Sequence, residues 1–455
     1  MDEEIISSLK QLAFEKNDEE ELAKLKSYYE NSDNIEELKK IYEFILQKNP
    51  NSLDVLRDLA DIYINNDKDY DKAKEFLQKA LSINNNDSEL HCQYGSLLEF
   101  SFGEYEQAKN HYLKAIELDS QNVDAYLNLS WLYLEHFNDI HTSYIVVQEA
   151  LKYVEDSEIY SQMGYIELMK YHDLDNAYDH LQKALELDKD NDLAYTYLGQ
   201  LYIIEKEYDK AKEIFSLALK REKVNDLLIM EYGKLLIVQY KDFKGAIAVL
   251  EKAVEIFPDK VIYYAYLANL HFVLGEVNEA KKYLHKAEDY VIDEQEALLM
   301  IGYLKVMLDD NKEEALMYFE KVIELNPTNL NALSFIGFYN LINNQHIDTA
   351  LDYFKKIADL SNDNFIIHFI IAQIYLQYYN DSTQALDYLL KINLNSLGKL
   401  EQSYLLYVIG SIYEKYVHNN HLALDYYEKA YLIKPDKFLE EVINRIYEND
   451  KTIIN

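Results

Sequence analysis

Small residues recur along this chain at a nearly constant interval of about 35 positions, and this period constrains the fold more than any other feature. The first small residue of each period is Ala60, Gly95, Ser130, Gly164, Gly199, Gly233, Ala268, Gly302, Gly337, Ala372 or Gly410. A second follows 12 or 13 positions later, at Ala73, Ala108, Ser143, Ala177, Ala211, Ala246, Ala280, Ala315, Ala350, Ala385 and Ala423. Self-similarity at such a period is typical of repeat architectures, in which one supersecondary unit stacks on the next.

Each period contains two helical patterns. A large apolar residue lies four positions after the second small residue, as at Leu77 and Phe215, and alanine usually follows three positions later. Apolar residues at these intervals form one face of an α-helix. Small residues let two helix backbones approach closely, so the pattern predicts antiparallel helix hairpins. All four prolines (Pro50, Pro258, Pro327 and Pro435) come just after a second helix, where proline ends the helix.

The spacing resembles that of the tetratricopeptide repeat family. The segment from 192 to 225 shows the pattern in full, with Tyr195, Leu198, Gly199, Tyr202, Ala211, Phe215 and Ala218 in the family's positions. The resemblance implies an all-α fold, a right-handed α-solenoid in which first helices line the concave face. It also implies a protein that binds peptides or protein segments and is rarely catalytic.

The repeats divide the chain into three segments. Residues 1–52 are predicted to form an N-terminal capping helix and a degenerate repeat, residues 53–436 about eleven tandem repeats, and residues 437–455 a C-terminal capping helix and tail. Three repeats depart from the pattern, because Glu167, Lys305 and Asn340 occupy an aromatic slot.

The chain is strongly acidic. It has 81 Asp and Glu against 45 Lys and Arg, a formal net charge of −36. A surface this negative repels phosphate backbones and anionic lipid headgroups, so direct nucleic-acid binding is not expected. The charge favours either solubility of a long exposed array or attraction of a basic partner.

Catalytic and metal-binding signatures are missing from the sequence. It has no phosphate-binding glycine loop, no Gly-x-Ser-x-Gly elbow and no His-Glu-x-x-His motif. The single cysteine, Cys92, allows no internal disulfide and fits helix packing better than reactivity. We therefore expect no enzyme activity, no cofactor and no metal.

The sequence gives no sign of a membrane or export segment. The N-terminus lacks the basic and apolar regions of a signal peptide, and no apolar run approaches the roughly 18 residues of a membrane span. We expect no membrane insertion and a cytoplasmic location, with a nuclear one as an alternative. The oligomeric state stays open.

The resemblance also implies where partners bind. Ligand-contacting side chains of this family project from first helices, and many of these positions here are apolar or aromatic. They are Leu127, Trp131, Leu134, Tyr165, Met169, Met230, Ile237, Val238, Phe272, Leu299, Tyr303, Met307, Phe338, Ile342 and Phe369. Some of these side chains are expected either in a groove or packed against the next hairpin. A clamp for a terminal carboxylate is not expected, because its slots hold Leu127, Trp131, Ser161, Tyr165, Lys234 and Asn269.

Three functions follow from these observations. The first is a protein-interaction scaffold or assembly factor that binds an apolar or amphipathic segment in its groove. The second is an acidic, chaperone-like binder of a basic partner protein, which would weaken steeply with salt. The third is a receptor for a short regulatory peptide.

Overall fold

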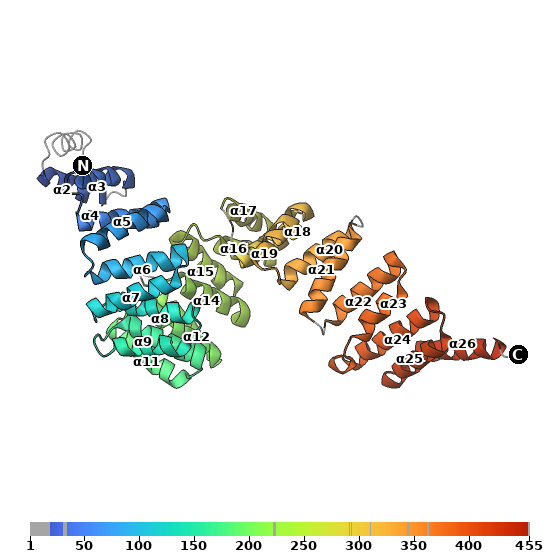
Figure 1. Cartoon of the computed structure of the whole chain (residues 1–455). Helices are drawn as coiled ribbons and strands as arrows, with labels where there is room; N and C mark the ends of the chain where they lie inside the picture. Colours follow the sequence, from blue (N-terminus) through green and yellow to red (C-terminus); the bar gives the residue numbers. More distant parts are fainter. Residues whose placement is uncertain are drawn as a thin grey trace. The chain divides into compact units, whose positions relative to one another are not determined.

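A computed structural model describes residues 19–30, 34–221, 224–290, 292, 294–309, 311–343, 346–361 and 364–453. Within these residues the regular structure is helical, and no strand occurs (Figure 1). The chain forms two compact units, residues 1–242 and 243–455. The prediction of an all-α solenoid built from antiparallel helix hairpins is confirmed. The segment boundaries predicted at 52/53 and 436/437 stay predictions.

The first unit contains five complete hairpins that follow an N-terminal pair. Its helices, in chain order, are α2 (Glu19–Glu30), α3 (Ile35–Lys48), α4 (Leu53–Ile62) with η2 (Tyr63–Asp67), α5 (Tyr70–Ile83), α6 (Ser88–Phe102), α7 (Tyr105–Leu118), α8 (Val123–Glu135), α9 (Ile140–Ala150), α10 (Ser157–Ile166) with η3 (Glu167–Tyr171), α11 (Leu174–Leu187), α12 (Asp192–Ile204), α13 (Tyr208–Ala218) and α14 (Asp226–Leu235) with η4 (Leu236–Tyr240). First helices of successive hairpins pack on one another, as α10 does on α12.

The second unit repeats the same plan. It contains α15 (Phe243–Ile256), α16 (Val261–Val273), α17 (Val277–Glu288), α18 (Gln295–Asp309), α19 (Lys312–Leu325), α20 (Leu330–Ile342), α21 (Ile347–Leu360), α22 (Phe365–Ile374) with η5 (Tyr375–Tyr379), α23 (Ser382–Leu390), the 3-10 turn η6 (Leu394–Ser396), α24 (Lys399–Lys415), α25 (Asn420–Ile433) and α26 (Lys437–Ile453). The turn η6 lies in the longest gap between small residues, which separates Ala372 from Gly410.

The small residues act as expected inside each hairpin. A Cβ atom added to Gly164 would lie 2.6 Å from Leu181 Cγ, and one added to Gly199 would overlap the ring of Phe215. Leu181 and Phe215 are fully buried. The second helix therefore seats a large side chain directly on the backbone of the first.

Asparagine side chains begin many first helices. Asn191 Oδ1 accepts the N–H of Ala194 at 2.7 Å and caps α12. The same side chain donates through Nδ2 to Ser157 Oγ at 2.6 Å, and Ser157 in turn donates to the carbonyl of Ala184 at 2.9 Å. One asparagine thus satisfies a free helix N–H and joins two consecutive first helices.

Four first helices end in a π-helical turn: η2, η3, η4 and η5. Each is followed by a residue with positive φ, at Lys68, His172, Lys241 and Asn380. In these repeats the two small residues lie 13 positions apart, whereas the interval that ends at Ala211 is 12. The same interval of 13 occurs without a π-helical turn, as between Gly95 and Ala108, so this turn is one of two ways in which a first helix of this length ends.

Tyrosine hydroxyls link neighbouring hairpins, which accounts for part of the 43 tyrosines. Tyr240 donates to Asp209 at 2.5 Å in the first unit, and Tyr318 donates to Glu288 at 3.3 Å in the second. Carboxylate acceptors strengthen such bonds.

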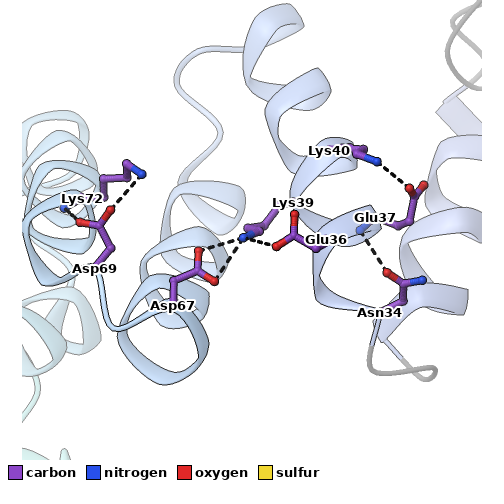
Figure 2. Close-up of polar contacts among 8 residues, drawn as sticks. All are labelled: Asn34, Glu36, Glu37, Lys39, Lys40, Asp67, Asp69 and Lys72. Carbon is purple, nitrogen blue, oxygen red and sulfur yellow. Dashed lines mark hydrogen bonds and ion pairs between the residues drawn. The ribbon is translucent and has the colours of Figure 1, made fainter.

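An ionic contact joins the N-terminal pair to the next hairpin. Lys39 Nζ on α3 lies 2.8 Å from Asp67 Oδ2 in η2 and 2.7 Å from Glu36 Oε1 (Figure 2). Hydrogen bonds to these two carboxylates raise the pKa of Lys39. The pair α2–α3 is therefore attached to the array by charge as well as by apolar packing.

Candidate functional site

An aromatic row runs along the first helices of the first unit. The ring centroids of Trp131 on α8 and Tyr165 on α10 are 4.9 Å apart, as are those of Tyr165 and Tyr197 on α12. Tyr197 is buried, whereas Trp131 and Tyr165 are half-buried. Tyr165 packs on the buried ring of Tyr197, and Trp131 packs on Tyr165, so the orientations of both half-buried rings are fixed. They present a rigid apolar surface beside Leu127, which is also half-buried.

A column of exposed apolar side chains lies at the C-terminal ends of these first helices. Phe100, Met169, Ile204 and Val238 are 40–70% exposed, and each comes five positions after the small residue of its repeat. Sequence reasoning singled out Met169 and Val238 but missed Phe100 and Ile204. Their register relative to Gly95 and Gly199 was the signal that could have found them.

The second unit has a column in the same register. Val273, Met307 and Ile342 are 54–71% exposed. Tyr303 and Phe338 lie one helical turn earlier, and each packs edge-on against a buried phenylalanine, with centroids 5.1 Å apart. Their outer faces stay accessible. Exposed apolar side chains gathered in this way are typical of partner-binding surfaces.

The remaining predicted residues are partly or fully packed. Met230, Ile237, Phe272, Leu299 and Phe369 are half-buried on their helices. Phe369 extends toward Tyr404 on α24, with ring centroids 5.9 Å apart. Only part of each of these five side chains is accessible on the surface of the first helices.

Leu134 was wrongly included among the groove residues. It is 3% exposed and belongs to a core cluster with Val147 and Ile159. Its repeat has the same spacing as its neighbours, but position 134 lies four residues after Ser130 and points into the hairpin. The exposed column lies one residue further along the helix, where this repeat has Glu135.

The repeats with charged residues in the aromatic slot form buried polar networks there. Glu167 accepts the Tyr144 hydroxyl at 2.7 Å and lies 2.7 Å from His180 Nδ1. Lys305 pairs with Glu288 and lies 3.3 Å from Glu314. Glu167 and Lys305 are both buried, so each departure is matched by partners of opposite charge or by donors.

Two cavities lie along α4, α6 and α8. One, of about 320 Å³, is lined by Asp61, Ile64, Cys92, Gln93, Ser96, Leu97, Phe100, Ser101, Asp124 and Asn128. The other, of about 400 Å³, is lined by Glu89, Cys92, Gln93, Asp119, Gln121, Asn122, Val123 and Asp124. Cys92, Gln93 and Asp124 border both, so the two cavities are neighbours.

Carboxylates near these cavities are crowded. Burial and the charge of Asp58 raise the pKa of Asp61. Burial and the charges of Asp156, Asp124 and two further aspartates raise the pKa of Glu158. The first helices of this unit therefore present a negative field to whatever occupies the cavities.

Cys92 carries no nucleophilic signature. Its side chain is buried, Asn128 Nδ2 lies 3.6 Å from its Sγ, and burial raises the pKa of its thiol to about 11. A thiol with a raised pKa is a poor nucleophile at neutral pH. Among the described residues, no three His, Cys, Asp or Glu side chains are grouped as metal ligands would be. No helix in the described ranges is both long and apolar enough to cross a membrane.

The fold and the site define a helix-hairpin repeat protein whose first helices display apolar and acidic side chains. Three sequence families match the chain: one described as tetratricopeptide repeat at residues 37–92 and 168–227, one described as TPR repeat at 97–136, and another tetratricopeptide repeat at 296–329. The matched segments are repeats of the tetratricopeptide repeat family. Members of this family generally mediate protein–protein interactions and are generally non-catalytic.

Solved structures of similar fold include those of three different proteins. One concerns PilF of Pseudomonas aeruginosa (21% identity, 46% of this chain and 94% of that chain covered, TM-score 0.36). One is the human IFIT1 dimer with m7Gppp-AAAA (17% identity, 77% of this chain and 91% of that chain covered, TM-score 0.43). The third is YrrB, described as a TPR protein with an unusual peptide-binding site (24% identity, 41% of this chain and 95% of that chain covered, TM-score 0.28). No curated protein sequence matches the chain significantly.

Proposed function

We propose that the protein is a non-catalytic interaction scaffold that binds an apolar or amphipathic protein segment along its first helices. The observation that carries this proposal is the exposed apolar column, present in the same register in both units. Apolar side chains exposed at one slot of several repeats differ from singly exposed ones, which occur on most protein surfaces. Aromatic and methionine side chains suit an amphipathic helix laid into a groove. A cytoplasmic or nuclear location belongs to the same proposal.

Affinity capture from a lysate of the source cells tests this proposal with one variant for each unit. Trp131→Ala/Tyr165→Ala removes the aromatic surface of the first unit, and Tyr303→Ala/Phe338→Ala removes that of the second. The control is Tyr153→Ala/Tyr178→Ala, because these rings are 49% and 39% exposed at or after second helices. Circular dichroism establishes that each variant is folded.

A partner that the wild type and the control retain, and that a first-helix variant loses, supports the proposal and assigns the partner to one unit. A partner retained by both first-helix variants would contradict it. Capture at low and high salt separates the first candidate function from the second, because an apolar contact tolerates salt and an ionic one does not.

A specific observation favours the second candidate, an acidic binder of a basic partner. Burial, together with the charges of neighbouring carboxylates, raises the pKa values of Asp61 on α4 and Glu158 on α10. A receptor for a short regulatory peptide stays a third candidate. It predicts a saturable peptide ligand with defined stoichiometry.

A further inference from the structure

The two units differ in the first turn of their first helices. In the first unit each of these helices has an acid there: Asp54, Glu89, Asp124, Glu158, Asp192 and Asp226. In the second unit, α18 and α24 have one each, Glu296 and Glu401, whereas α16, α20 and α22 have none. Acids in a first turn stabilise any helix through its dipole, and second helices carry them too. Every first helix of the first unit carries such an acid, against only α18 and α24 in the second unit, so the acidic first turns are concentrated in the first unit.

The acids of the first unit border the cavities. Asp124 lines both cavities, Asp61 lines one and Glu89 lines the other. Arg57 lies 2.6 Å from Glu89 and 3.2 Å from Asp87, so part of this charge is neutralised within the chain. In the part of the chain that the structure describes, no lysine or arginine forms an ion pair with Asp61, Asp124 or Glu158.

Apolar walls stand beside these carboxylates. Phe100, which is 70% exposed, lines the same cavity as Asp61 and Asp124, together with Ile64 and Leu97. A lysine or arginine has an apolar stem and a charged head, so it can lay its stem on Phe100 while its head meets the carboxylates. The Trp131–Tyr165 pair continues the apolar surface on the next two first helices.

We propose that the first-helix surface of the first unit binds a basic amphipathic segment of a partner protein, with a lysine or arginine in the cavity between Asp61, Asp124 and Phe100 and apolar side chains on Trp131 and Tyr165. This inference rests on the proposed function and narrows it. The partner segment carries positive charge, and the carboxylates of the first unit bind it.

Three synthetic peptides test the inference on the full chain. Each is a helix of about 18 residues with leucine on one face, and the opposite face carries lysine, glutamine or glutamate. Trp131 is the only tryptophan of the chain and lies on the proposed surface, so its fluorescence reports binding directly. We expect the lysine peptide to change this emission. At low salt, where charge attraction is little screened, it should bind at least about tenfold more tightly than the glutamine peptide.

A matched pair of charge variants locates the effect. Asp61→Asn/Asp124→Asn removes two carboxylates from the cavity without changing side-chain size. Glu75→Gln/Glu213→Gln makes the same change of net charge at exposed positions of the second helices α5 and α13. We expect the first variant to weaken the lysine peptide about tenfold, the control less than twofold, and both to leave the glutamine peptide unchanged.

The outcomes separate the inference from the function on which it rests. Equal binding of the lysine and glutamine peptides, or equal weakening by both charge variants, would overturn the inference and leave apolar binding intact. Tighter binding of the glutamate peptide would overturn it as well. If none of the peptides changes the Trp131 emission, the inference fails, whereas the capture experiment above decides the proposed function separately.

Discussion

At the scale of single residues, the close approach of two helices depends on glycine, whose Cα carries a hydrogen atom where other residues carry a Cβ. Gly199 faces the ring of Phe215 at a distance that leaves no room for a Cβ, whereas the ring of Phe319 stands 3.0 Å from the Cβ position of Gly302. The two glycines occupy the same slot of two repeats. They therefore allow a direct comparison of how tightly two hairpins are packed.

We expect Gly199→Ala to destabilise the protein by about 1–3 kcal/mol, because the added methyl group must displace a fully buried ring. Gly302→Ala should destabilise the protein distinctly less. Urea unfolding of both variants measures the difference, and Phe215→Leu added to Gly199→Ala should recover part of the loss. Equal costs at the two positions would contradict this account of the packing.

The His180–Glu167 contact predicts a pH dependence. Its hydrogen bond to Glu167 raises the pKa of His180 above the ordinary value of about 6.5. Because the pKa of His180 is higher in the folded state than in the unfolded state, protonated His180 stabilises the fold. This stabilisation is fully present at pH values below the unfolded-state pKa and is lost as the pH rises through the folded-state pKa.

The stability difference between wild type and His180→Gln should therefore be largest at pH 6 and shrink at pH values above about 6.5. Thermal melts of both proteins from pH 6 to pH 9 measure it. A difference that stays constant over this range would show that the histidine contributes only by packing.

At the scale of elements, the start of each first helix does two things at once. The carbonyl oxygen of the Asn191 side chain caps α12, and its amide nitrogen holds Ser157 at the start of α10. Local helix stability and stacking between hairpins thus share one side chain.

We expect Asn191→Ala to cost about 1–2 kcal/mol, because it removes the cap and leaves the buried Ser157 hydroxyl without its donor. Asn191→Asp keeps the capping oxygen but not the amide, so its loss should be smaller. Hydrogen exchange of α10 and α12 distinguishes the two effects. Identical exchange in both variants would mean that the link to Ser157 contributes nothing.

At the scale of the whole molecule, the ends of the array need covering. Leu439 and Ile446 on α26 are buried against Leu406 and Tyr427, so this helix closes the apolar face left by the last hairpin. A terminal repeat without such a cover exposes its core face.

We expect Leu439→Ala/Ile446→Ala to lower the melting temperature and to increase self-association, because the apolar face of α24 and α25 becomes accessible. Leu432→Ala is the control, since Leu432 is 79% exposed. Thermal melts and light scattering after size exclusion measure both effects. Behaviour like that of the control would show that α26 is not needed as a cover.

The sequence predicted the helices well because their signal is periodic and local. Spacing alone placed Gly199 and Phe215 on the two helices of one hairpin and the prolines after second helices. It did not predict the polar networks of Glu167 and Lys305, since their partners Tyr144, His180 and Glu288 come from other helices. It also missed Phe100 and Ile204, because an exposed and a packed apolar residue look alike in a sequence until the rotation of the helix is known.

The π-helical turns have a consequence for how this chain can change in length. A residue added to a helix rotates everything after it by about 100° around the helix axis, and the apolar face would turn away from its neighbour. Repeats with 12 and with 13 positions between their two small residues both have the alanine as the fourth residue of the second helix, as in α13 and α5, and in four of the longer repeats the first helix ends in η2, η3, η4 or η5. We therefore expect a single-residue insertion at this corner to leave the second helix in register, so that repeats of unequal length can follow one another.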